Sequence, residues 1–99
     1  DLVPDNCESN YHAFWILFDD KNQREKFQNF CFSKEVTSLK HYIPLHSSIM
    51  GKKVSRTASK MDITNLAGEN CVRLPMYPMT QEEIEYTCDV VNKSLKNLV

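Results

Sequence analysis

The 99 residues include 41% hydrophobic and 25% charged side chains and have a formal net charge of −1, a composition typical of one small globular domain or a piece of one. This near-neutral balance argues against a nucleic-acid or membrane-surface partner, because such partners attract strongly basic chains. The longest apolar run, residues 13–18, is far shorter than the roughly 20 residues that a membrane helix needs.

The four cysteines are spread along the chain and form no Cys-x-x-Cys pair. A secreted domain of this size would normally carry a denser set that pairs into disulfides, so we expect free thiols and a cytoplasmic location. The chain opens Asp1-Leu2-Val3-Pro4, with neither an initiator Met nor a signal segment, as expected of a fragment.

The first predicted element is a strand over residues 11–18, where both alternating faces are apolar. This pattern predicts a central strand that is covered on both sides. Asp19 or Asp20 then offers an N-cap for a helix over residues 21–32. We expect the aromatic residues of this strand and helix to form the core: Tyr11, Phe14, Trp15, Phe18, Phe27, Phe30 and Phe32.

Three further segments are weaker signals. Residues 36–42 contain β-branched side chains and predict a second strand, which Pro44 ends because proline lacks an amide donor. Residues 47–64 show no sustained period and suggest an exposed, partly mobile loop. A short helix over residues 64–70 and a third strand over residues 71–75 follow.

The last element has the clearest signal, because Thr80-Gln81-Glu82-Glu83 is a capping box. It predicts a helix over residues 80–97, with one apolar face formed by Ile84, Cys88, Val91, Leu95 and Leu98. The whole order predicts an α+β fold, with a small, mainly antiparallel three-stranded sheet and helices packed on it.

The segment His41-Tyr42-Ile43-Pro44-Leu45-His46 is the densest in chemically useful side chains. Pro44 stiffens the backbone and biases the preceding residue to an extended conformation, so the segment suits the wall of a binding site. Imidazoles can donate hydrogen bonds to phosphate or sugar oxygens and can exchange protons near neutral pH. The alternative is that both histidines are ordinary residues at a strand end and in a loop.

Other candidate sites are weaker or remain open. The three histidines have neither the helical pairing nor the short spacing of a metal site, so none is predicted. Arg73 is either a partly buried structural cation or an anion ligand. A basic loop could meet phosphates, although a solvated surface explains it better: Lys52, Lys53, Arg56 and Lys60.

Four segments together resemble the C-terminal region of sugar-nucleotide aminotransferases of pyridoxal-phosphate fold type I. They are Val3-Pro4-Asp5-Asn6-Cys7 leading into Asn10-Tyr11-His12-Ala13-Phe14-Trp15-Ile16; Arg24; His41-Tyr42-Ile43-Pro44-Leu45-His46-Ser47-Ser48 with Gly51; and Val72-Arg73-Leu74-Pro75-Met76-Tyr77 followed by the capping box. Tyr11 is a departure, since close relatives often carry glycine there.

The resemblance implies that residues 1–99 are a single C-terminal small domain and that an N-terminal domain supplies the lysine that binds pyridoxal 5'-phosphate. It places His41, Tyr42 and His46 beside the nucleotide sugar and implies no catalytic, cofactor-binding or metal-binding residue in this chain. The implied enzyme is a homodimer that transfers an amino group from glutamate, leaving 2-oxoglutarate, to a dTDP-4-keto-6-deoxyhexose for cell-surface polysaccharide synthesis. Without the lysine, the chain alone should be inactive.

Two alternatives stay open. The chain could be a free-standing α+β binding or regulatory module, or the enzyme could aminate the sugar at C3 rather than C4.

Overall fold

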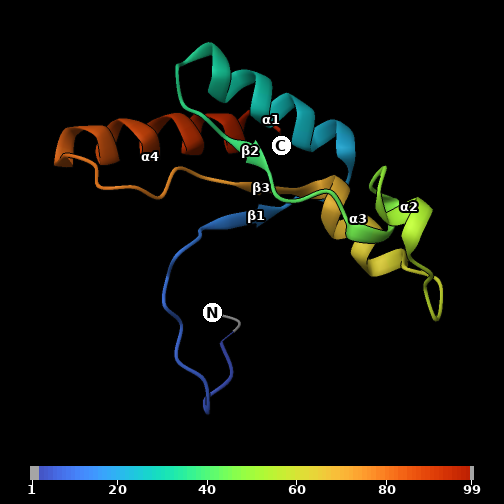
Figure 1. Cartoon of the computed structure of the whole chain (residues 1–99). Coiled ribbons are helices and arrows are strands. Elements are labelled where there is room, and N and C mark those ends of the chain that lie inside the picture. The colour runs from blue at the N-terminus through green and yellow to red at the C-terminus, as the bar shows by residue number, and fades with distance from the viewer. Residues whose placement is uncertain (1–2, 99) are drawn as a thin grey trace.

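The computed structural model describes residues 3–98; Asp1 and Leu2, at which the predicted fragment opens, and Val99 lie outside the described residues. The chain forms an α+β fold, as predicted, with a three-stranded antiparallel sheet and helices packed against it (Figure 1). In chain order the elements are β1 (Trp15–Leu17), α1 (Lys21–Ser33), β2 (Leu39–Lys40), the 3-10 turn η1 (Leu45–Ser47), α2 (Gly51–Val54), α3 (Asp62–Asn70), β3 (Cys71–Arg73) and α4 (Gln81–Lys96).

The sheet has the order β1-β3-β2, so the central strand is β3 and not the predicted strand at residues 11–18. Val72 is the register partner of Ile16 on β1 and of Lys40 on β2. The strands are also shorter than predicted, although one further ladder bond joins the amide of Leu74 to the carbonyl oxygen of Phe14 at 2.9 Å.

Helices α1 and α4 lie on one face of the sheet and enclose the core (Figure 1). Ile16 and Val72 point into this core, where Phe27, Cys31 and Val72 are fully buried. The described residues cover only that face, so the prediction of a strand covered on both sides is wrong. The remaining buried core residues are Phe18, Val36, Val90 and Val91.

The open face explains why most of the predicted aromatic core is wrong. Adjacent strand residues point to opposite faces, so Trp15 and Leu17 point away from the helices and remain 49% and 48% exposed. Of the seven predicted aromatic residues only Phe18 and Phe27 are buried, with their rings 5.0 Å apart, and Phe30 is half-buried.

Both long helices begin where their caps predict. Asp20 accepts a hydrogen bond from the amide of Gln23 at 2.9 Å at the start of α1. The reciprocal bonds between Thr80 and Glu83 confirm the capping box of α4. The apolar face of α4 packs only in its second half, because Ile84 and Cys88 stay exposed. No helix within residues 3–98 is long and apolar enough to cross a membrane.

The predicted loop at residues 47–64 is exposed but not structureless. It contains the end of η1 and all of α2, and α3 begins at Asp62, before the predicted residue 64. Gly51 permits the close packing of α2 on η1, because a β-carbon there would clash with the carbonyl oxygen of Leu45. The second strand is confined to Leu39–Lys40 because Val36 and Ser38 turn into the core before pairing begins.

Candidate functional site

The segment from His41 to His46 follows β2 and includes the first two residues of η1, at one end of the sheet. The rings of His41 and Tyr42 meet edge to face with their centroids 4.7 Å apart. His41 and Tyr42 are exposed, whereas His46 is half-buried. The sequence-predicted site residues therefore belong to one continuous segment, but their side chains have different surroundings.

Two contacts fix this segment on α3. Pro44 packs on Gly68 so closely that a β-carbon at Gly68 would lie 2.7 Å from Cγ of the proline ring. Two residues further, Nε2 of His46 lies 2.9 Å from Oδ1 of Asn65 and donates to it in the tautomer that carries the proton on Nε2. Gly68 and Asn65 are thus supporting residues of the site.

A hollow of about 270 Å³ lies between the segment and α3. His41 and Tyr42 line it together with Gly68 and Cys71, whereas His46 does not. Burial raises the pKa of the Cys71 thiol, so the thiol stays protonated at neutral pH and is a poor nucleophile. The remaining lining is largely apolar: Ile43, Pro44, Leu45, Thr64 and Ala67.

Arg73 lies beside this hollow, on the central strand. Its Cζ is 5.7 Å from the centroid of the Tyr42 ring, within the range of a cation–π interaction. The order in space is therefore His41, Tyr42, Arg73.

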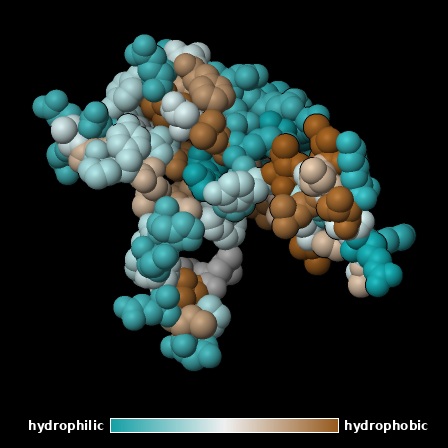
Figure 2. Space-filling model, viewed as in Figure 1, coloured by the Kyte–Doolittle hydropathy of each residue, from teal (hydrophilic) through white to brown (hydrophobic). Residues whose placement is uncertain are grey.

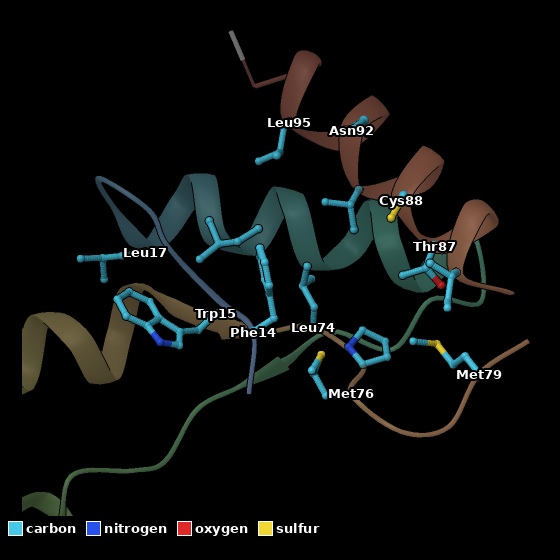
Figure 3. A pocket seen from close by; sticks show the side chains of 14 residues that line it. Phe14, Trp15, Leu17, Leu74, Met76, Met79, Thr87, Cys88, Asn92 and Leu95 are labelled. Atoms are coloured by element: carbon cyan, nitrogen blue, oxygen red, sulfur yellow. The ribbon is translucent and has the colours of Figure 1, made fainter. Parts of the chain in front are cut away.

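A larger apolar groove of about 710 Å³ runs between β1 and α4, and none of the predicted substrate residues lines it. Figure 3 shows Phe14, Leu74 and Cys88 around this space, with Met76 and Met79 from the segment that leads to α4. Other lining residues include Trp15, Leu17, Ile84 and Leu95. No part of residues 3–98 lies over this groove, and the sequence pattern did not predict it, because this pattern assigns Phe14 and Trp15 to the core.

A second apolar surface covers η1, α2 and α3. Figure 2 shows hydrophobic atoms gathered on the right of the molecule, where Figure 1 places α2 and α3. Leu45, Ile49 and Ile63 are each more than four-fifths exposed there. Contiguous apolar surface of this kind marks contacts with other protein or ligand surfaces more often than free solvent-facing surface.

The described residues do not fit a resident metal or pyridoxal phosphate. No group of three His, Cys, Asp or Glu side chains within residues 3–98 could hold a metal ion. All lysines are exposed, and none lines the hollow beside His41 and Tyr42. A lysine that forms a Schiff base is usually desolvated in a pocket, so this part of the chain offers no such lysine.

Comparison with known proteins defines the class. The sequence profile of the DegT/DnrJ/EryC1/StrS aminotransferase family matches residues 2–92. The chain therefore belongs to this family.

Two solved structures share the fold. The aminotransferase TlmJ from Streptoalloteichus hindustanus matches with a TM-score of 0.80 and 20% identity over 97% of this chain and 25% of its own. The sugar aminotransferase Spr1654 from Streptococcus pneumoniae, in its PMP form, matches with a TM-score of 0.72 and 19% identity over 93% of this chain and 24% of its own. The chain thus spans about a quarter of the length of these two proteins.

Proposed function

We propose that residues 1–99 are the C-terminal small domain of a longer pyridoxal-phosphate-dependent sugar-nucleotide aminotransferase. The observation that carries the proposal is the family match over residues 2–92. The full-length enzyme transfers an amino group from glutamate to a dTDP-4-keto-6-deoxyhexose and releases 2-oxoglutarate. The PMP form of one structural neighbour supports the cofactor, which acts as the electron sink of such reactions when bound.

In this proposal, residues outside this chain provide the cofactor lysine and cover the open apolar groove. The domain before this one supplies the lysine for the cofactor, since the lysines here are exposed. The same domain covers the groove between β1 and α4. Two facts support this domain as the cover of the groove. The chain spans only a quarter of the length of its structural neighbours, and the groove is lined mostly by apolar side chains.

His41, Tyr42 and His46 form the substrate wall in this proposal. His41 and Tyr42 line the same hollow and present an imidazole and a phenol that can donate to sugar or phosphate oxygens. His46 reaches α3 through Asn65, and this contact leaves its Nδ1 to accept a hydrogen bond from a sugar hydroxyl. Pro44 on Gly68 keeps the segment in place when substrate enters.

The particular enzyme that we propose is dTDP-4-amino-4,6-dideoxygalactose transaminase, which acts in polysaccharide synthesis of the enterobacterial common antigen type. The support is the form His-Tyr-Ile-Pro-Leu-His, with Ser47, Ser48 and Gly51 after it. Amination at C3 of the sugar is the alternative within the same family. We further propose a cytoplasmic homodimer; the free cysteines and the apolar surface on η1, α2 and α3 support these two assignments.

The test uses the full-length protein encoded by the reading frame that contains this chain, reconstituted with pyridoxal phosphate. Glutamate should convert the cofactor to its amino form, and a dTDP-4-keto-6-deoxyhexose should return it to the aldehyde form. A 3-keto isomer should react at least about tenfold more slowly, since one misplaced hydrogen-bonded group costs 1.4 kcal/mol or more. No cofactor conversion by glutamate would favour the free-standing module, and preference for the 3-keto isomer would move the amination to C3.

A further inference from the structure

Arg73 is a half-buried cation that lacks an anionic partner within residues 3–98. The ion pairs of the described residues both end on Glu25, from Lys21 and from Arg24. Arg24 also donates to the carbonyl oxygen of Glu69 and to the side chain of Gln28, so its guanidinium is used inside the fold. The charge of Arg73 is therefore available to a ligand in a way that the charge of Arg24 is not.

The sheet register places Arg73 on the open face. Arg73 is the register partner of Trp15 on β1 and of Leu39 on β2, so these three side chains share one face. Their neighbours Ile16 and Val72 pack into the core on the opposite face. Leu39 is 51% exposed and does not line the groove between β1 and α4, so the part of this face beside β2 is open to a ligand.

The ring of Tyr42 holds the guanidinium without neutralising it. A cation–π contact restricts the guanidinium plane, while the N–H groups at its edge remain able to donate. Two parallel N–H groups of a guanidinium match two phosphate oxygens, and such paired, charge-assisted hydrogen bonds are among the strongest in proteins. Tyr42 also lines the hollow shared with His41, so an anion at Arg73 would lie next to the proposed substrate wall.

We propose that Arg73 binds the diphosphate of the nucleotide sugar and that Tyr42 is its positioning residue. The inference rests on the proposed function, from which the diphosphate comes, and adds the residue that recognises it. The basic residues of the exposed loop, such as Arg56, are then solvated and take no part in binding.

The experiment titrates the full-length protein, loaded with pyridoxal phosphate, with dTDP and separately with thymidine by calorimetry. Arg73→Met should weaken dTDP binding about 10- to 100-fold, as loss of hydrogen bonds to a charged group implies, and leave thymidine binding unchanged. Arg73→Lys should recover part of the loss, because it restores the charge but not the paired donors. Tyr42→Leu should also weaken dTDP binding, because it removes the ring that positions the guanidinium.

Arg56→Met is the matched control and should leave both titrations unchanged. Unchanged dTDP binding by Arg73→Met, equal losses for dTDP and thymidine, or a parent protein that does not bind dTDP would each overturn the assignment. If Arg73→Met unfolds, Arg73→Lys and Tyr42→Leu test the assignment instead, because both must weaken the binding of dTDP more than the binding of thymidine. The glutamate half-reaction tests the proposed function separately, because its failure would refute the aminotransferase activity. The dTDP titration tests the role of Arg73 in either case.

Discussion

Nη1 of Arg24 donates to Oε1 of Gln28, one turn further along α1, at 2.8 Å. Nε of Arg24 reaches the carbonyl oxygen of Glu69 at 2.9 Å, and Nε2 of Gln28 donates to the carbonyl oxygen of Ser38 at 2.8 Å. This buried network joins α1 to the end of α3 and to Ser38, the residue before β2. The site segment begins at His41, directly after β2.

Replacing Arg24 by methionine should therefore lower the free energy of unfolding by roughly 1.5–3 kcal/mol, because it leaves buried acceptors without donors. The control is Lys21→Met, which removes only an exposed ion pair to Glu25 and should cost about 0.3–0.5 kcal/mol. Urea denaturation of both variants measures the difference. Equal losses would show that the network does not hold the two elements together.

The capping box of α4 should contribute measurably to stability. The amide of Glu83 donates to Oγ1 of Thr80 at 3.3 Å, and the amide of Thr80 donates to the Glu83 carboxylate at 2.7 Å. Thr80→Ala should cost about 1 kcal/mol by urea denaturation. Thr57→Ala, in an exposed segment without helix, should cost less than about 0.5 kcal/mol, and a Thr80 variant no weaker than this control would contradict the assignment.

The buried thiol of Cys31 predicts a loss of stability in alkali. Burial raises its pKa from 9.0, and the neighbouring hydroxyl groups of Ser38 and Ser94 lower it only in part. Above pH 9 the unfolded chain releases this proton while the folded chain retains it. The unfolded state then binds fewer protons, so the free energy of unfolding falls as pH rises from about 9 towards the folded pKa.

Urea denaturation between pH 8 and 10.5, with a reductant present, measures this slope. Cys31→Ala should make the slope shallower, since it removes the titrating group. Val90→Ala leaves a comparable vacancy in the core but keeps the thiol, so it should retain the parent slope. The assignment to Cys31 would be refuted if Cys31→Ala kept the slope of the unsubstituted protein, or if the free energy of unfolding of the unsubstituted protein rose with pH.

In the full-length enzyme, the histidines should affect the sugar half-reaction selectively. His41→Ala and His46→Ala should each lower its efficiency roughly 10- to 150-fold, the equivalent of one hydrogen bond to a charged group, and change stability by no more than about 1 kcal/mol. The glutamate half-reaction is the internal reference and should stay within about twofold.

Asn65→Ala separates substrate binding by His46 from its contact with α3. It removes the 2.9 Å partner of His46 but keeps the imidazole, so it should cost less activity than His46→Ala. If Asn65→Ala costs as much, His46 only holds η1 on α3. Near-normal sugar turnover in both histidine variants, or unfolding of either, would return the histidines to a structural role.

Local signals predicted the parts of the fold that local interactions determine. The capping box located the start of α4, and Asp20 located the start of α1, because a cap acts within three or four residues. The prediction that the strand at residues 11–18 is covered on both faces was wrong, because such coverage depends on a second layer that local sequence does not encode. On one face of this strand Ile16 packs against the core, whereas Trp15 and Leu17 on the other face stay about half exposed.

The sequence pointed to a candidate site segment, whose role stays a prediction, but not to the contacts that hold this segment in place. Pro44 and the two flanking histidines marked the segment, whereas the contacts that hold it, Pro44 on Gly68 and His46 with Asn65, join residues far apart in the chain. Arg73 remained ambiguous for the same reason, since only the sheet places it beside Tyr42.

Transfer of labelled nitrogen tests the central claim most directly. The full-length protein, incubated with pyridoxal phosphate, ¹⁵N-glutamate and a dTDP-4-keto-6-deoxyhexose, should yield an amino sugar nucleotide that carries the label at C4, with one 2-oxoglutarate formed for each amino group transferred. Mass spectrometry detects the label and NMR locates it. A folded, cofactor-loaded protein that yields no labelled sugar nucleotide would contradict the account.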